Sequence, residues 1–377
     1  MKIGIDASNL RQGGGRTHLV ELLSNGEEHL GPIEQVIVWG GADTLAKLPR
    51  RVWIDPRHER MLDGSLVRRL LWQETNLVSR ARGVDLLFAP GGVTSPLVRP
   101  RVVMSRNLLP FDEIERARYG RSLTRLRLEV LRLGQARSFA SADAVIFLND
   151  YARERVVSAM PHPPRRVAVI PHGVADRFRL DPRPARLRSQ VTADSPLRVL
   201  YVSSLAPYKH QGAVIEAVKR LREHVDIELT LIGGADDSAY VDSVRHDIGV
   251  ATAAGAKISY LGPKVFAELH DAYAAAEIFV FASSCENMPN ILLEAMSSGL
   301  PIACARRGPM PHILGDAGVY FDPERPDEIA AALRALADDP DLRARSAALS
   351  VARSRAFSWA RCARETFSFL ADVGATS

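Results

Sequence analysis

The sequence predicts an α/β protein built from two doubly wound parallel sheets in tandem. The chain has 377 residues, more than a single hydrophobic core usually organises. Short apolar runs alternate with amphipathic stretches along the whole chain, and this alternation is interrupted once, over residues 175–196. With 46% hydrophobic and 25% charged residues, the composition is typical of a globular protein and excludes disordered and fibrous classes.

The first half of the chain contains six predicted strands and four predicted helices. The strands are short apolar runs at Lys2–Asp6, Gln35–Trp39, Asp85–Ala89, Val102–Ser105, Ala144–Leu148 and Val167–Ile170. The helices are amphipathic stretches at Thr17–Ser24, Ser65–Arg80, Tyr119–Ser141 and Asp150–Met160. Because parallel strands need long crossover connections, usually helices, this order predicts a mostly parallel sheet with helices on both faces.

Residues 175–196 are rich in proline, arginine and aspartate and lack an apolar period, which predicts a linker. The alternation then resumes with predicted strands at Arg198–Val202, Glu228–Ile232, Lys257–Tyr260, Ile278–Ala282 and Pro301–Ala305. Helices are predicted at Gln211–Glu223, Ala239–Thr252, Val265–Ala274, Ile291–Ser298 and Pro326–Ala337, with another toward the C-terminus. Two such domains predict a cleft between the carboxyl ends of their strands, where doubly wound sheets bind ligands.

The cysteines and the N-terminal segment indicate a cytoplasmic protein. Cys285, Cys304 and Cys362 are odd in number and unevenly spaced, which argues against a disulfide framework or a zinc site. Asp6 stands where a signal peptide needs its apolar core, and no apolar run reaches the roughly 18 residues of a membrane span. We therefore expect a cytoplasmic location, which is compatible with contact with a membrane surface.

A run of glycines, Gly13 to Gly15, follows the first predicted strand and precedes a helix. Glycine lets the backbone approach a ligand closely, and a helix N-terminus offers free N–H groups, a combination that suits a phosphate. A plain flexible turn would give the same pattern. The run is not GxGxxG and no ribose-binding acid follows the next strand, so a nicotinamide site is not expected.

Lys209 lies in the loop after the first strand of the second domain, at the end of the segment SSLAPYK. At this strand-to-helix turn its ammonium can reach a diphosphate held at the edge of the sheet. A solvated surface lysine is the alternative interpretation.

Two glutamates eight positions apart bracket a predicted helix N-terminus after the strand Ile278–Ala282. Glu286 lies on the loop, and Glu294 lies about one turn inside the helix. The N–H groups from Met288 to Asn290 are predicted to hold a diphosphate. Either glutamate alone would also be explained by a preference for acidic residues at the start of a helix.

The segment from Ser283 to Met296, followed by Leu300-Pro301, resembles the E-x7-E signature of the retaining GT-B glycosyltransferases of family 4. Further pieces of that family pattern stand in order along nearly the whole chain: the glycine-rich first loop, Ala142–Ala144, Ile170–Val174, the loop ending in Lys209, Ile232–Gly234, Tyr260–Gly262, Ile313–Gly318 and Phe321–Pro323. The resemblance implies a GT-B fold with domains at residues 1–176 and 197–356. It also implies that a C-terminal helix, residues 357–377, packs back on the first domain.

The resemblance further implies roles for individual residues. Glu286 would bind the hydroxyls of the donor sugar, Glu294 the nucleotide ribose, and Lys209 the departing diphosphate. The other residues around the donor would be Gly14, Gly15, Ser204, Gly233, Asn287, Met288, Pro289 and Asn290. The acceptor would attack on the face of the leaving group, whose diphosphate takes the proton, so no protein nucleophile, cofactor or metal is required.

The implied donor is a UDP- or GDP-sugar, and the implied acceptor is a glycan or a polyprenyl-diphosphate-linked glycan, as in polysaccharide or lipopolysaccharide biosynthesis. Three positions depart from the family pattern: Ser204 replaces an arginine, Pro289 a glycine and Asn107 a histidine. Arg106, Arg306 or Arg307 would supply the charge missing at Ser204. Arg106 and Asn107 are also expected on the acceptor side.

The net charge of +5 is concentrated between Arg101 and Arg137, where nine arginines stand against four acidic residues. In the predicted helix Tyr119–Ser141, a turn of 100° per residue brings four arginines within about 60° of one another: Arg118, Arg121, Arg125 and Arg132. A separate side, expected to pack on the domain, carries Leu123, Leu126, Val130 and Leu133. The basic ridge would attract anionic lipid headgroups or polyprenyl diphosphates. An ordinary solvated helix is the alternative, and nucleic acid is not expected, because no binding module accompanies the charge.

Two other classes share the two-domain plan. A nucleotide-sugar 2-epimerase would release a changed donor without an acceptor, and it needs an acid–base set that the sequence does not display. A nucleotide-sugar binding protein without turnover would account for Ser204 and Asn107 but not for Lys209, Glu286 and Glu294. Glycosyl transfer is therefore the leading hypothesis.

Overall fold

The computed structural model describes residues 1–11, 13–235, 237–265 and 268–376. The chain divides into two compact units, one formed by Met1–Gly173 with Ser358–Ser377 and the other by Val174–Phe357. The C-terminal helix α14 (Trp359–Ala375) belongs to the first unit, where it packs against α1 (Gly13–Ser24) and β4 (Leu86–Ala89). The proline-rich segment 175–196 belongs to the second unit.

The described residues of the first unit form a seven-stranded parallel sheet with the order β3-β2-β1-β4-β5-β6-β7. The strands besides β4 are β1 (Lys2–Asp6), β2 (Gln35–Gly40), β3 (Ile54–His58), β5 (Arg101–Met104), β6 (Ala144–Phe147) and β7 (Val167–Val169). The six predicted strands are confirmed to within one residue at each end. The edge strand β3 was not predicted. The order reverses between β1 and β4, so the loops after these strands open at the topological switch point.

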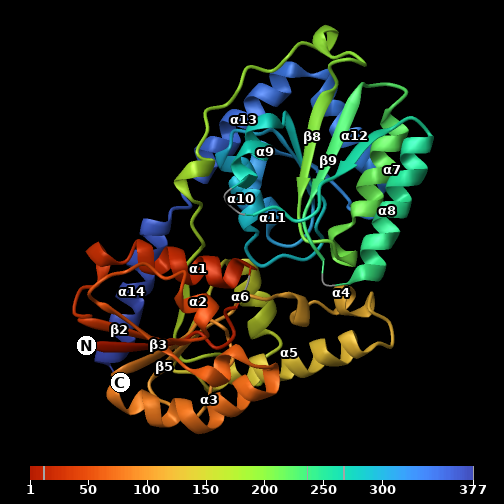
Figure 1. Cartoon of the computed structure of the whole chain (residues 1–377). Helices are drawn as coiled ribbons and strands as arrows, with labels where there is room; N and C mark the ends of the chain where they lie inside the picture. The colour runs from red at the N-terminus through yellow and green to blue at the C-terminus, as the bar shows by residue number, and fades with distance from the viewer. Residues whose placement is uncertain (12, 236, 266–267, 377) are drawn as a thin grey trace. The chain divides into compact units, whose positions relative to one another are not determined.

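Helices cover both faces of this sheet, and Figure 1 shows α1 and α3 on opposite sides of it. Besides α1 and α14, the helices are α2 (Ala42–Leu45), α3 (Leu66–Arg80), α4 (Glu113–Ala117), α5 (Leu123–Ser141) and α6 (Asp150–Val157). On the α3 side, Trp72 and Leu77 pack with Trp39 and Leu87 in one apolar cluster.

Two helices of the first unit begin four residues away from their predicted starts. Helix α1 begins at Gly13 rather than Thr17, so Gly14 and Gly15 form its first turn instead of a preceding loop. Helix α5 begins at Leu123 rather than Tyr119, because the hydroxyl of Ser122 caps it by accepting a hydrogen bond from the Arg125 N–H at 3.2 Å.

The prediction of which side of α5 packs on the domain is wrong. The expected apolar side is exposed, with Leu123 at 85%, Leu126 at 60%, Val130 at 63% and Leu133 at 44%. The helix is buried instead through Leu128, Gln135, Ala136, Ser138, Phe139 and Ala140. Small and polar residues that lie under a helix carry little apolar signal, so the more hydrophobic stripe pointed the wrong way.

The described residues of the second unit form a six-stranded parallel sheet with the order β10-β9-β8-β11-β12-β13. The strands are β8 (Leu197–Val202), β9 (Ile227–Ile232), β10 (Lys257–Tyr260), β11 (Ile278–Phe281), β12 (Ile302–Ala305) and β13 (Gly318–Phe321). The five predicted strands are confirmed to within one residue at each end. The short edge strand β13 was not predicted.

The helices of the second unit are α7 (Gln211–Leu221), α8 (Ser238–Ala253), α9 (Leu269–Ala275), α10 (Asn290–Ser297), α11 (Met310–Leu314), α12 (Pro326–Asp338) and α13 (Pro340–Ser354). Figure 1 shows α7 and α8 on one side of the sheet and α9 and α10 on the other. The predicted helix Val265–Ala274 falls partly on residues outside the described ones. Among those described, no helix is both long enough and apolar enough to cross a bilayer.

The switch point of the second sheet lies between β8 and β11. Strand β8 pairs with β9 on one side and with β11 on the other, all in parallel. The loops that leave β8 and β11 therefore emerge side by side at the carboxyl edge of the sheet, which is where such sheets hold ligands.

Candidate functional site

The loop after β8 is folded tightly enough to bury its lysine. A single 3₁₀ turn, Pro207–Lys209, is followed by His210 in the left-handed region, with φ 51° and ψ 36°. The Tyr201 hydroxyl donates to the carbonyl of Lys209 at 2.5 Å and fixes this turn to the sheet. The side chain of Lys209 is therefore largely buried and fixed in position. The alternative interpretation, a solvated surface lysine, is wrong.

Direct hydrogen bonds join this loop to the loop after β11. The Ser284 N–H donates to the Tyr208 carbonyl at 2.9 Å, and the Ser284 hydroxyl lies 2.9 Å from Nε2 of His210. Both serine and histidine are buried. Buried bonds of this kind keep two loops in one register, because breaking them leaves unsatisfied polar groups.

An ion pair lies where the two loops meet. Nζ of Lys209 contacts Oε1 of Glu286, and the two side chains are only 7% and 15% exposed. The ammonium also lies 5.0 Å from the ring centre of Tyr208 and 5.9 Å from that of Phe281. The structure thus brings together two predicted site residues that are far apart in the sequence, and it holds the ammonium beside two aromatic faces.

Helix α10 begins directly after this pair, and its N-terminus carries no side-chain cap. Pro289 occupies the N-cap position without a side-chain hydrogen bond, so the first N–H groups of the helix lack intrahelical acceptors. Oδ1 of Asn290 is also buried without a hydrogen-bond partner. Asn287 and Met288 are buried beside it. Free N–H groups and the positive end of the helix dipole favour an anion at this point.

Glu294 lies inside α10 and is buried against Tyr273, whose hydroxyl donates to Oε2 at 3.0 Å. Burial raises the pKa of Glu294 to about 7, and the Tyr273 hydrogen bond and the charge of Arg177 only partly oppose this. A carboxylate that is costly to bury without further donors is suited to accept hydrogen bonds from ligand hydroxyls.

Gly233 permits a close approach between the loops after β9 and β8. Its φ is 153°, and a Cβ at this position would lie 1.7 Å from the carbonyl oxygen of Ser203. The Tyr260 hydroxyl donates to the Gly233 carbonyl at 2.8 Å. Next to it, Ser204 is exposed and its carbonyl accepts from the Gln211 amide at 3.0 Å. Only glycine fits at position 233, because any Cβ would clash with the Ser203 carbonyl.

In the first unit, Arg106 lies against the first turn of α1. A Cβ at Gly15 would be 2.7 Å from Nη1 of Arg106. Asn107 is exposed, and its Oδ1 accepts a hydrogen bond from the Leu109 N–H at 3.1 Å. Its side chain thus stabilises the local turn. Of the other arginines considered for the charge missing at Ser204, Arg306 stacks on Tyr320 at 5.2 Å and Arg307 pairs with Asp322 at 2.9 Å.

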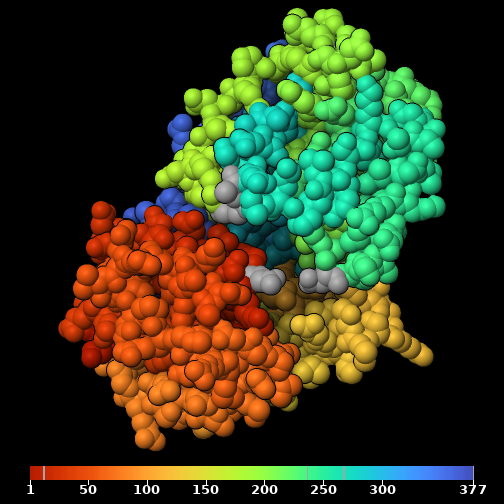
Figure 2. Space-filling view, viewed as in Figure 1, coloured from red at the N-terminus to blue at the C-terminus, as the bar shows by residue number. Residues whose placement is uncertain are grey.

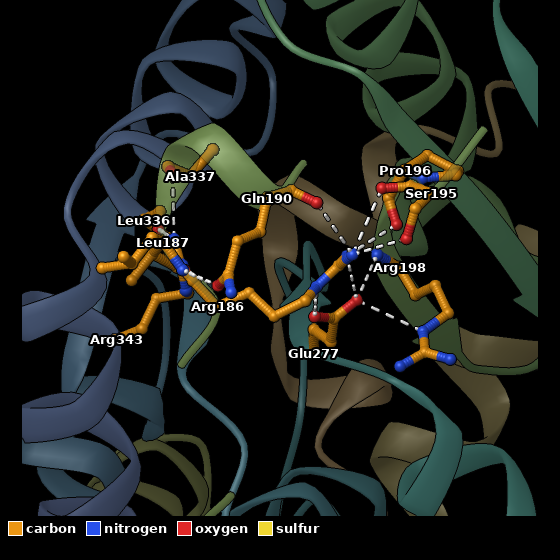
Figure 3. Close-up of polar contacts among 10 residues, drawn as sticks. All are labelled: Arg186, Leu187, Gln190, Ser195, Pro196, Arg198, Glu277, Leu336, Ala337 and Arg343. Carbon is orange, nitrogen blue, oxygen red and sulfur yellow. Dashed lines mark hydrogen bonds and ion pairs between the residues drawn. The ribbon is translucent and has the colours of Figure 1, made fainter. Parts of the chain in front are cut away.

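Sequence reasoning missed an arginine cluster at the opposite edge of the second sheet. Figure 3 shows Arg186 and Arg198 bound to the carboxylate of Glu277. Two nitrogens of Arg186 donate to it at 2.7 and 2.8 Å, and Arg198 donates at 3.2 Å. Arg343 donates to the carbonyls of Leu336 and Ala337. These arginines line a cavity of ≈ 170 Å³ beside the amino ends of β8 and β11. The cluster ties the segment before β8 to the domain and lies away from Lys209.

The three cysteines are buried and free. Burial raises the pKa of the Cys362 thiol to about 12, which leaves it in the unreactive thiol form at neutral pH. Among the residues that the structure describes, no three histidine, cysteine or acidic side chains are grouped so that they could hold a metal ion.

Residues 196–339 match the family model described as glycosyl transferases group 1. This stretch lies within the second unit and contains the Lys209 and Glu286 pair and Glu294. It covers less than half of the chain, and the first unit lies outside it.

Curated relatives carry the same kind of name. The chain is 26% identical over 238 residues to the O-antigen chain mannosyltransferase B of Escherichia coli, covering 61% of this chain and 60% of that protein. It is 32% identical over 240 residues to a GDP-mannose-dependent alpha-(1-6)-phosphatidylinositol monomannoside mannosyltransferase of Mycolicibacterium smegmatis, covering 60% of each. The chain thus spans about 60% of the length of these two relatives.

Solved structures resemble the chain over nearly its full length. Sucrose-phosphate synthase from Thermosynechococcus elongatus has a TM-score of 0.76 at 18% identity and covers 100% of both chains. Anabaena Alr3699/HepE in complex with UDP and glucose has a TM-score of 0.72 at 19% identity, covering 98% of this chain and 99% of that one. At these identities the likeness concerns the fold, which is GT-B with two Rossmann-like domains, as the sequence predicts.

Proposed function

We propose that this chain is a retaining glycosyltransferase of family 4, of the E-x7-E type, which transfers a hexose from a UDP- or GDP-sugar to a glycan or lipid-linked glycan. The observation that carries the proposal is the contact between Lys209 and Glu286 beside the uncapped N-terminus of α10. A cation and a helix N-terminus provide two sources of positive potential for a diphosphate, and two glutamates provide acceptors for hydroxyl groups. The match of residues 196–339 to group 1 glycosyltransferases supports this assignment.

In the proposed reaction, the acceptor hydroxyl oxygen bonds to the anomeric carbon on the face that the diphosphate leaves. The bond between the anomeric carbon and the phosphate oxygen breaks, and its electron pair stays on that oxygen, which takes the proton of the hydroxyl. Charge therefore develops on the diphosphate, where Lys209 and the α10 N–H groups stabilise it. Glu286 holds the sugar hydroxyls and Glu294 holds the ribose, so these residues position the donor.

The first unit is proposed to contribute Gly14 and Gly15 to the donor phosphates, and Asn107 with Arg106 to the acceptor. Because fixed positive groups of the chain stabilise the leaving diphosphate in this proposal, we expect turnover without an added metal ion. An assay in EDTA checks this expectation.

The function is tested by incubating the chain with a panel of UDP-, GDP- and ADP-sugars, with and without a lipid-linked glycan extract. We expect release of free UDP or GDP that depends on the acceptor, together with a glycosylated product of unchanged anomeric configuration. Formation of an epimer without acceptor would instead identify an isomerase. Binding without release or product would identify a nucleotide-sugar binding protein, and either result would overturn the proposal.

We further propose that the exposed side of α5 lies on an anionic membrane surface, as suits an enzyme with a lipid-linked acceptor. The exposed leucines and valine of α5 are accompanied by Arg121, Arg127 and Arg137, which are exposed and form no side-chain hydrogen bond or ion pair with described residues. Of the four arginines expected to form the ridge, three do not extend freely from it: Arg118 pairs with Glu115, Arg132 pairs with Glu129, and Arg125 is half-buried. The fourth, Arg121, is exposed as expected.

Helix α3 extends the same kind of surface. Leu66, Val67, Leu70 and Leu71 of α3 are between 42% and 65% exposed. The pKa of Arg69 on α3 is lowered first by burial, then by the charge of Arg11, and then by the charge of Arg127 on α5. Because Arg127 acts on Arg69, the two helices lie near each other. Both helices reach the surface of the first unit in Figure 2, α3 in orange and α5 in yellow. Apolar side chains interspersed with unpaired arginines are typical of helices that rest at a lipid interface.

We expect the double variant Leu126→Glu/Val130→Glu to bind vesicles containing an anionic phospholipid about tenfold more weakly, since it loses apolar contact and gains repulsion. Vesicle co-sedimentation at low and high salt measures this, and wild-type binding should weaken as salt rises. The matched control is Val250→Glu, at a 50% exposed position on α8. Equal vesicle binding by the double variant and wild type, or self-association of wild type through this surface without vesicle binding, would contradict the proposal.

A further inference from the structure

The arginine-lined cavity of the second unit holds more positive charge than its one carboxylate offsets. Arg183, Arg186, Arg198 and Arg343 line this cavity of ≈ 170 Å³, and Glu277 is the one acidic side chain among the described residues that line it. Glu277 shares its charge between two of them, because Arg186 and Arg198 bind it at 2.7 Å and 3.2 Å. Guanidinium groups stay protonated, so their mutual repulsion costs free energy unless other groups offset it.

The protein itself accounts for two of the four arginines. Three nitrogens of Arg186 donate to protein acceptors, with the carboxylate of Glu277 among them. Arg343 donates to carbonyls in the last turn of α12, where the negative end of the helix dipole favours a cation. Neither of these side chains needs a ligand.

The other two arginines keep N–H groups that no described residue accepts. The side chain of Arg198 contacts Glu277 through Nε, and Figure 3 shows its two terminal nitrogens without a contact to the other residues drawn. Arg183 donates through Nη2 to the carbonyl of Tyr273 at 3.0 Å, which leaves its Nε and Nη1 without an acceptor among the described residues. Burial lowers the pKa of Arg183, and the charge of Arg198 lowers it further, so the two guanidinium groups lie near each other.

The size and the lining of the cavity indicate a small anion. Its ≈ 170 Å³ is several times the roughly 30 Å³ that a water molecule occupies in the liquid, but below the roughly 300–1,000 Å³ of pockets for drug-sized ligands. Leu300, Pro301 and Ala347 add an apolar wall. The side chain of Arg198 is 51% exposed, so a ligand can enter from solvent. A phosphate offers acceptor oxygens to several N–H groups at once, whereas a carboxylate offers two.

We propose that Arg183 and Arg198 bind a small phosphate-bearing anion in this cavity, at a site separate from that of Lys209. Arg198 lies near the start of the six-residue strand β8 and Lys209 follows its end, so the strand separates the two sites by about 20 Å. Arg183 belongs to the segment 175–196 and Arg198 to the sheet, so the anion joins that segment to the sheet. The site does not depend on sugar transfer.

The test is isothermal titration calorimetry of the full chain with inorganic phosphate. We expect saturable binding by wild type, and about tenfold or more weaker binding by Arg198→Met, which loses charge-assisted hydrogen bonds to the anion. Arg198→Lys keeps a positive charge and should retain part of the binding. Arg245→Met, at an exposed arginine on α8 of the same unit, is the matched control and should bind as wild type does.

Two further variants separate this site from the fold and from the candidate active site. Glu277 keeps both hydrogen bonds from Arg186 in Arg198→Met, so we expect this variant to stay folded, which thermal unfolding checks. Arg183→Met should weaken phosphate binding to a similar extent, and Lys209→Ala should leave it unchanged. Phosphate should also slow amide hydrogen exchange across residues 183–196 in wild type but not in Arg198→Met.

A parallel titration with glycerol phosphate identifies the source of the phosphate group. Tighter binding of the ester assigns the cavity to an organic phosphate, and tighter binding of inorganic phosphate assigns it to the free ion. The inference is overturned by a wild type without saturable binding, or by unchanged affinity in both Arg198→Met and Arg183→Met.

A loss of binding in Lys209→Ala but not in Arg198→Met would place the phosphate at the candidate active site and would also overturn the inference. So would a lower unfolding temperature in every arginine variant, Arg198→Lys included, with a parallel loss of binding, since the cluster would then be structural. If phosphate binds through Arg198 but the chain transfers no sugar, the site stands and the proposed function fails.

Discussion

Lys209→Ala is expected to lower kcat for sugar transfer by about 10²–10³-fold, while the Kd of the nucleotide sugar changes only severalfold. The reason is that the leaving group carries its extra negative charge in the transition state and not in the bound donor. The leaving phosphate oxygen gains negative charge only as the anomeric bond breaks, so a fixed ammonium stabilises the transition state more than the bound donor. Single-turnover kinetics and isothermal titration calorimetry measure the two quantities separately.

The ion pair with Glu286 complicates this variant, because removal of Lys209 leaves a largely buried carboxylate without its partner. Thermal unfolding must therefore accompany the kinetics. Lys209→Met/Glu286→Gln removes both charges and should recover any lost stability without recovering turnover. Lys219→Ala is the control, since that lysine lies on α7 and pairs with Glu216. Turnover that falls only in step with the folded fraction, or recovers in the double variant, would assign Lys209 a structural role.

Glu294→Gln is expected to weaken nucleotide-sugar binding by about 10–100-fold, because the ribose loses hydrogen bonds to an ionised acceptor. The same change is expected to stabilise the ligand-free chain at pH 8. Gln keeps an oxygen that can accept the Tyr273 hydrogen bond but removes the buried charge. Opposite signs for binding and stability distinguish a ligand-binding glutamate from one that supports the fold.

The pH dependence follows from the folded pKa of about 7, above the ordinary value of 4.5. The folded state holds the Glu294 proton where the unfolded state has lost it. The stabilising contribution is therefore complete below about pH 4.5 and declines as pH rises to about 7, by an amount on the order of 3 kcal/mol. Donor affinity changes in the opposite direction, rising through about pH 7 as the carboxylate ionises.

Denaturant unfolding and donor titration between pH 5 and pH 8 measure both trends. We expect the stability difference between Glu294→Gln and wild type to be large at pH 8 and small at pH 5, whereas Glu268→Gln, at an exposed position, shows neither effect. A variant that is less stable than wild type at pH 8, or that binds the donor normally, would remove Glu294 from the proposed site.

Most strands of both sheets, though not the edge strands β3 and β13, could be predicted because buried parallel strands are apolar runs. The edge strand β3 could not, since Ile54–His58 is mostly polar and includes Pro56, a residue that edge positions tolerate. The packing side of α5 was predicted wrongly for the converse reason. Leu123 and Leu126 are exposed, so the more hydrophobic stripe of α5 does not mark the side that packs on the domain.

The sequence predicts which residues form the candidate site, but it does not predict which of them contact one another or which are buried. The strand-to-helix positions of Lys209 and Glu286 were visible, but their contact depends on β8 and β11 being neighbours, which sequence order does not show. The buried state of Glu294 depends on Tyr273 from another helix. The state of Arg106 was also hidden, because only packing reveals that its Nε is buried without a hydrogen-bond partner.

A crystal structure of the chain with a bound UDP- or GDP-sugar tests the central claim most directly. The account predicts the diphosphate between Nζ of Lys209 and the N-terminus of α10, with the ribose hydroxyls on Glu294 and the sugar hydroxyls on Glu286. A nucleotide bound elsewhere in the second unit, such as the arginine-lined cavity near Arg183 and Arg198, with the Lys209 and Glu286 contact undisturbed, would contradict it.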